Sequence, residues 1–64
     1  MTKDEQMAAL KQAYNLEMSL LFTQILNSVR VGVADDVVTT EFIGTLDPLN
    51  KAFALASAAI EAQP

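Results

Sequence analysis

The 64-residue chain contains no cysteine and no histidine. Without cysteine it has no disulfide framework, and without either residue the usual ligands of a structural zinc site are missing. Histidine is also the commonest general base, and cysteine is a common nucleophile and soft metal ligand. We therefore expect no metal, no cofactor and no enzymatic activity.

Positive charge is scarce as well. Four basic residues stand against eight acidic ones, which gives a net charge of −4. The basic residues are scattered along the chain: Lys3, Lys11, Arg30 and Lys51. Binding to nucleic acid or to anionic lipid depends on a clustered basic surface. The sequence therefore predicts neither a nucleic-acid partner nor a membrane partner.

Long hydrophobic runs are absent too. The longest uncharged run covers 12 residues, 18–29, whereas a membrane-spanning helix needs about 20. The first six residues are polar and acidic, unlike a secretory signal. We expect a cytoplasmic protein.

What the chain has in abundance is apolar side chains, at 52% of its residues. This fraction is too high for a disordered tail. A domain of this size nevertheless buries only about 60% of the surface of its unfolded chain. Small scaffolds without disulfides or metals are commonly stabilised by oligomerisation. Residues 1–64 are therefore expected to form one domain that associates with a second copy of itself or with another protein.

Residues 3–30 have the periodicity of a single amphipathic helix. Thr2 and Glu5 match a capping box at its start, Arg30 lies in its last turn, and Gly32 suits a left-handed cap after its end. The apolar side chains of one face recur at spacings of three and four residues. They are Met7, Leu10, Tyr14, Met18, Leu21, Ile25 and Val29.

Residues 31–36 form the predicted connection, whose length suits a helix–helix hairpin. The density of β-branched residues leaves a second interpretation open, in which residues 31–38 form a short strand. No second strand is predicted to pair with it, and isolated strands are unstable.

Residues 37–62 are predicted to form the second helical stretch, with Asp35, Asp36 or Thr39 as its N-cap. Its apolar stripe is Val38, Phe42, Leu46, Leu49, Phe53, Ala56 and Ile60.

Asp47 and Pro48 interrupt this stretch, yet the stripe keeps its phase across them. We expect either one helix kinked near residues 47–48 or two abutting helices. The two helical stretches have similar lengths and a short connection, which predicts an all-α antiparallel hairpin. Assembly of two such hairpins would give a four-helix bundle.

The first helix carries a second apolar stripe, formed by Ala9, Ala13, Leu16 and Leu20. It lies roughly 130° to 150° around the helix from the main face. Phe22 and Leu26 extend the apolar surface on the other edge. A helix that is apolar on nearly three sides suggests a four-helix environment, and we predict these six residues as partner-binding. The alternative is that they are ordinary exposed alanines and leucines.

Asp35, Asp36 and Glu41 form the only acidic cluster. A divalent-cation site would need the alternating oxygen ligands of a calcium loop, which are absent. Capping of a solvated turn is the preferred interpretation.

In layout, and in its opening Met1-Thr2-Lys3 followed by Glu5, the chain resembles the Rop-type plasmid copy-number regulators. These are short helical hairpins that dimerise into four-helix bundles. Their RNA binding implies a basic, polar helix face, which this chain lacks. Small two-helix cochaperones of type III secretion needles have a similar size and shape.

The leading hypothesis is a non-enzymatic protein–protein interaction module, a small adaptor, regulator or inhibitor of bacterial or phage character. Its partner would be itself, another helical protein, or both, bound through apolar helix faces. One alternative is a small cochaperone that covers a partner's helix. Another is a structural subunit of a filament or shell.

Overall fold

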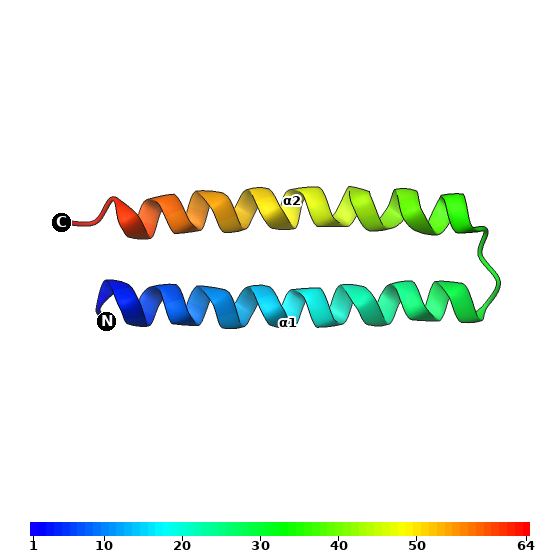
Figure 1. Ribbon diagram of the computed structural model, residues 1–64, viewed down its shortest axis with the longest axis horizontal. Helices are drawn as coiled ribbons and strands as arrows, with labels where there is room; N and C mark the ends of the chain where they lie inside the picture. The colour runs from blue at the N-terminus through cyan, green and yellow to red at the C-terminus, as the bar shows by residue number, and fades with distance from the viewer.

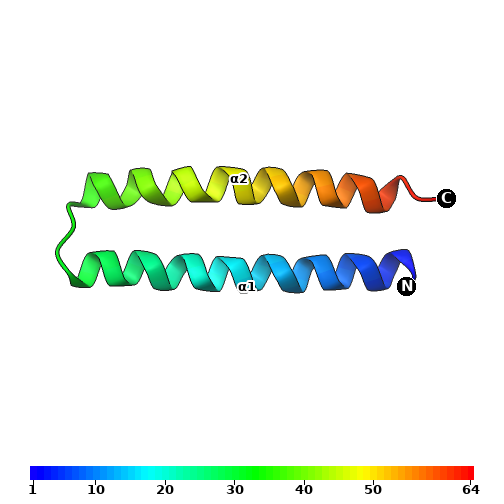
Figure 2. The ribbon, with the colours of Figure 1, turned by 180° about the vertical axis from the view of Figure 1, so that it is seen from behind.

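The computed structural model describes residues 1–64 and consists of two helices, α1 (Lys3–Arg30) and α2 (Asp35–Glu61), joined by a short loop. The helices run antiparallel along their whole length, so both chain ends lie at the end opposite the loop (Figures 1 and 2). The predicted all-α hairpin is confirmed, and no strand forms over residues 31–38.

The ends of α1 follow the sequence signals. The Glu5 backbone N–H donates to Thr2 Oγ1 at 3.1 Å, and the Thr2 N–H donates to Glu5 Oε1 at 3.2 Å, which completes the capping box. At the other end, Gly32 takes φ +88°, a conformation that suits only glycine well. The Gly32 N–H donates to the Val29 carbonyl and the Val33 N–H to the Ser28 carbonyl, as in a Schellman motif.

The start of α2 corrects the sequence prediction. Its N-cap is Ala34, which has no side-chain oxygen to offer, and none of Asp35, Asp36 and Thr39 takes that position. Because the free N–H groups of this turn face water, no side-chain cap is required. Asp35 and Asp36 occupy the first turn, where the helix dipole favours negative charge.

Pro48 lies inside α2 without ending it. The ring removes one N–H and crowds the carbonyl four residues earlier, which belongs to Gly44. Both residues are exposed, so water can satisfy the unpaired carbonyl. Figure 1 shows α2 as one helix with no sharp bend at this position. The alternative of two abutting helices is therefore wrong, and the expected kink is not a sharp one.

The helices pack along the predicted faces. Leu21 of α1 and Val38 of α2 are the two buried residues, and the other members of both stripes are partly buried, with one exception. Val29 is 55% exposed, contrary to prediction. At about 100° per residue it has turned roughly 80° away from Leu21, and Ser28 occupies the inner position instead.

The hairpin is only one helix thick. Its Cα atoms occupy 50 × 16 × 8 Å, whereas domains normally bury their apolar faces between two or more layers. Both broad faces of the hairpin are consequently open. Neither helix combines the length and the apolar character needed to cross a bilayer.

Candidate interaction surface

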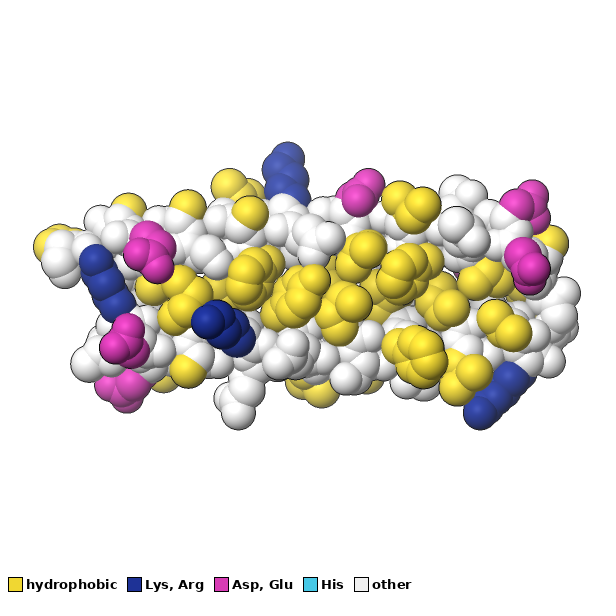
Figure 3. Space-filling view, viewed as in Figure 1, with side chains coloured by type: hydrophobic (Ala, Val, Ile, Leu, Met, Phe, Trp, Pro, Cys, Tyr) yellow, Lys and Arg dark blue, Asp and Glu magenta, His cyan; other side chains and the backbone are white.

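The chain leaves many large apolar side chains outside its small core. Those that are more than two-fifths exposed are Met1, Leu16, Leu20, Phe22, Val29, Val31, Val37, Ile43 and Leu55. On the face seen in Figure 3, hydrophobic side chains form a band along the line where α1 and α2 meet, while charged side chains lie mainly toward the ends and outer edges. Exposed apolar area of this extent is typical of surfaces that bind other proteins.

The structure places all six predicted partner-binding residues on α1, on two different flanks. Leu16, Leu20 and Phe22 are 61%, 51% and 63% exposed. Ala9 and Ala13 are exposed, and Leu26 is partly buried. Phe22 follows Leu20 by two residues and therefore lies about 160° around the helix from it. The second stripe and the Phe22–Leu26 pair thus belong to opposite flanks of α1.

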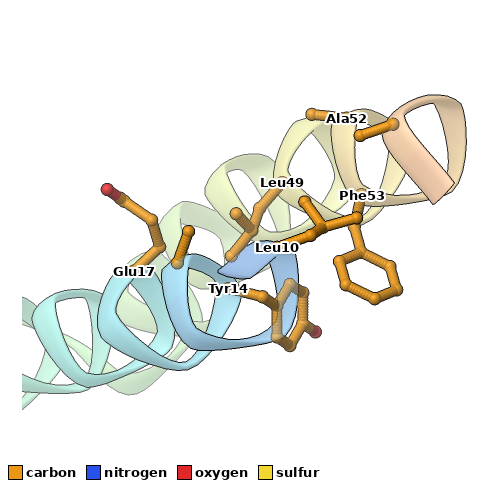
Figure 4. Close-up of a pocket in the computed structure, with 8 residues that line it drawn as sticks. Leu10, Tyr14, Glu17, Leu49, Ala52 and Phe53 are labelled. Carbon is orange, nitrogen blue, oxygen red and sulfur yellow. The ribbon is translucent and has the colours of Figure 1, made fainter. Parts of the chain in front are cut away.

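An apolar hollow of about 210 Å³ lies beside the second stripe, between the two helices (Figure 4). Seven of its eight lining residues are hydrophobic. They are Leu10, Ala13 and Tyr14 of α1 and Leu49, Ala52, Phe53 and Ala56 of α2, and the eighth is Glu17. The alanines make the hollow, because their short side chains leave the space between the larger neighbours unfilled.

A second, smaller hollow of about 120 Å³ continues this flank toward the loop. Leu20 and Gln24 border it from α1, and Thr45 and Leu49 from α2. Glu17 borders both hollows. Ala13 and Leu20 therefore border two adjoining hollows on one side of the hairpin, and we call this side the groove face.

Helix α2 contributes to the groove face through residues that the sequence prediction missed. Ala52 and Ala56 line the larger hollow. Leu55 and Ala59 each follow one of them by three residues, so they lie on the same side of α2. Leu55 is 63% exposed. The three-residue spacing that places these residues on one side of α2 is visible in the sequence. Only the position of the hollow, however, shows that this side of α2 adjoins the second stripe of α1.

Polar contacts fix the register of the two helices. The Tyr14 hydroxyl donates to Asn50 Oδ1 at 2.8 Å, and its ring lies 4.9 Å from that of Phe53. At the chain ends, Lys3 Nζ donates to the Glu61 carbonyl at 3.2 Å, and Gln63 Nε2 to Gln6 Oε1 at 2.7 Å. A buried or half-buried phenol ordinarily has such a partner, so Tyr14 is explained by packing.

No group of three or more acidic side chains lies close enough to hold a metal ion, and Asp35, Asp36 and Glu41 are all exposed. The one charged side chain in the groove is Glu17, which points away from the rings of Tyr14 and Phe53 in Figure 4.

Comparison with protein-family models, with curated proteins and with solved structures finds no significant match to this chain. Interpretation of the surface therefore rests on its geometry.

The exposed area indicates how much of the surface is available for a partner. The chain exposes 4775 Å², whereas a folded monomer of 6.9 kDa is expected to expose about 4,000 Å². The excess is roughly 800 Å², the share that one partner contributes to a protein–protein interface of standard size.

Proposed function

We propose that this chain is a non-enzymatic interaction module that acts by packing apolar helix faces against another helical surface, in the first instance a second copy of itself. The observation that carries the proposal is the single-layer hairpin, in which only Leu21 and Val38 are buried and leucine and phenylalanine side chains remain exposed on both flanks of α1. Completing a bundle would cover these side chains.

A structural subunit of a filament or shell is the second candidate. It is supported by the placement of the second stripe and of Phe22 on opposite flanks, because two unlike faces can form a head-to-tail contact that does not close. Such a subunit uses two interfaces per chain. The excess exposed area of roughly 800 Å² corresponds to one interface of standard size, which favours a closed dimer.

Light scattering on a sizing column, over a hundredfold range of concentration and with helicity measured in parallel, tests the proposal. A fixed small multiple of 6.9 kDa with high helicity supports self-association. A poorly helical monomer that folds when a helical partner is added supports an adaptor or cochaperone. A stable, fully helical monomer at every concentration contradicts the proposal, and growth without a plateau supports the filament.

A charged variant tests whether the exposed apolar residues are responsible. Leu16→Glu combined with Leu20→Glu should abolish assembly while leaving most of the helicity intact. The matched control is Asn15→Glu with Ser19→Glu, which adds the same charge at the same spacing on exposed polar positions of the same helix. The control should assemble like the unaltered chain.

A further inference from the structure

We infer that the groove face is the dimer interface, and that two copies lie on each other with their α1 helices antiparallel, so that Leu20 of each copy packs over Ala13 and the larger hollow of the other. This inference rests on the proposed self-association and specifies its face and register. The first support is the area excess of roughly 800 Å² per chain, which matches a single interface.

The second support comes from the register. When two antiparallel copies of α1 overlap along their whole length, residue i faces residue 33 − i of the other copy, because α1 runs from 3 to 30. Leu20 then faces Ala13. These two residues are seven apart, close to two turns, so both point to the same flank. Each pair therefore places an exposed leucine over the alanine that lines the hollow.

The same overlap applied to α2, which runs from 35 to 61, pairs residue i with 96 − i. Leu55 then faces Glu41 of the second copy. Val37, which is 44% exposed and lies five turns before Leu55 on the same side of α2, faces Ala59. A large side chain again meets a small one. Interdigitation of large and small residues is what close packing between helices requires.

The opposite flank does not fit a second copy in this way. Full overlap through the flank of Phe22 would place Phe22 over Lys11 and Val29 over Asp4. Apolar side chains meet charges on both flanks, since the groove face also places Leu16 over Glu17 and Leu55 over Glu41. Only the groove face adds an exposed leucine over an alanine that lines a hollow.

A second arrangement on the groove face has its two-fold axis parallel to the helices, so that both loops lie at the same end and α1 of each copy lies over α2 of the other. This arrangement is less favourable. The Tyr14–Asn50 and Lys3–Glu61 contacts show which residues lie at the same height along the hairpin. The numbers of residues at the same height sum to about 64, so Ala13 would meet residues 51 and 52 of the second copy, and Leu20 would meet residues 44 and 45. No leucine would then lie over Ala13, and the larger hollow would stay unfilled.

Cysteine crosslinking tests the face and the register directly, because the chain has no cysteine of its own. The variant carrying Ala13→Cys and Leu20→Cys should form covalent dimers on mild oxidation. A bond within one chain is excluded, because residues seven apart on a helix are separated by about 10 Å, beyond the reach of a disulfide. The matched control, Lys11→Cys with Phe22→Cys, has the same register on the opposite flank and should stay monomeric under denaturing, non-reducing conditions.

A size swap tests the same pair without crosslinking. Leu20→Ala and Ala13→Leu should each weaken dimerisation, by roughly a hundredfold for the first because two buried leucines are lost per dimer. Ala13→Leu combined with Leu20→Ala restores one leucine and one alanine to every pair. The double variant should therefore dimerise within about tenfold of the unaltered chain. Helicity of each variant shows whether it still folds.

Glu17 supplies an independent readout. In this register it faces residue 16 of the second copy, so the two Glu17 carboxylates approach each other near the two-fold axis. Glu17→Gln should tighten dimerisation several-fold at low salt, because it removes repulsion between like charges in the groove. Asp47→Asn, which removes the same charge at an exposed position away from the hollows, is the control and should have little effect.

The outcomes separate this inference from the proposed function. If the unaltered chain is a monomer, self-association itself fails. If it is a dimer, but the 11/22 pair crosslinks or the 13/20 pair does not, self-association stands and the groove-face register is wrong. Failure of the size swap to restore dimerisation contradicts the register in the same way.

Discussion

Leu20 and Leu21 are neighbours in sequence and differ in exposure, which allows a quantitative test of what covers the groove. Leu21 is 4% exposed and Leu20 is 51% exposed in the single chain. Truncating Leu21 to alanine removes about three methylene equivalents at roughly 0.8 kcal/mol each. Leu21 lines the smaller hollow, so neighbouring side chains have room to move into the space that truncation leaves. The free-energy cost of the cavity therefore stays small. We expect a loss of about 2 to 3 kcal/mol per chain.

The stability lost in the variant Leu20→Ala shows whether Leu20 stays exposed in a single chain or is covered by a second copy. If the exposed half of Leu20 stays in water, truncation should cost about 1 kcal/mol, half of the value for a fully buried leucine. If a second copy covers it, the cost should approach that of Leu21→Ala, about 2 to 3 kcal/mol per chain. Gln12→Ala, an exposed position on the same helix, is the control and should change stability by less than about 0.5 kcal/mol.

Urea unfolding followed by circular dichroism measures these differences. The unaltered chain should become more stable as its concentration rises, by about 1.4 kcal/mol per dimer for each tenfold increase. The reasoning is refuted if Leu20→Ala costs 1 kcal/mol or less at a concentration where light scattering shows a dimer. It is also refuted if the unfolding midpoint does not depend on concentration.

Further predictions concern the backbone of the hairpin, and each is checked by the same unfolding measurement. Gly32→Ala should destabilise the chain by about 1 kcal/mol, because the φ of +88° is strained for any residue with a Cβ. Gly44→Ala should stabilise it by about 1 kcal/mol, because a Cβ there has nothing within 4 Å and alanine is the better helix former. Ala34→Ser should add about 0.5 to 1 kcal/mol by supplying the side-chain cap that α2 lacks. Pro48→Ala should add about 2 kcal/mol by restoring the N–H bond to the Gly44 carbonyl.

The sequence predicts the fold correctly where a feature depends on a single local rule. The capping box at Thr2, the glycine cap at Gly32 and the spacing of the two apolar faces each depend on residues within one or two turns, and the structure has all of them. The N-cap of α2 was not readable, because three side chains could have capped the helix and the structure uses a fourth position, Ala34. Val29 departs from the predicted face for a geometric reason, since two consecutive steps of four residues, Leu21 to Ile25 to Val29, turn the side chain roughly 80° around the helix.

The groove face could be predicted only in part. The second stripe on α1 was visible from its periodicity, but the hollow between Ala13 and Ala52 depends on how the two helices are aligned. That alignment is set by contacts such as Tyr14 with Asn50, which lie 36 residues apart in sequence. For the same reason the sequence alone does not show that Leu55 of α2 lies on the same side of the hairpin as the second stripe.

Because the hairpin returns on itself, its first and last residues are neighbours, held near each other by the Gln63–Gln6 contact. Fluorescent labels at residues 1 and 64 would therefore give strong energy transfer whenever the hairpin is closed. If the chain opened to cover a foreign helix, with α1 and α2 in line, the labels would separate by up to about 80 Å, at 1.5 Å per helical residue. The closeness of the termini thus provides an optical measure of hairpin opening, one that does not require the partner to be labelled.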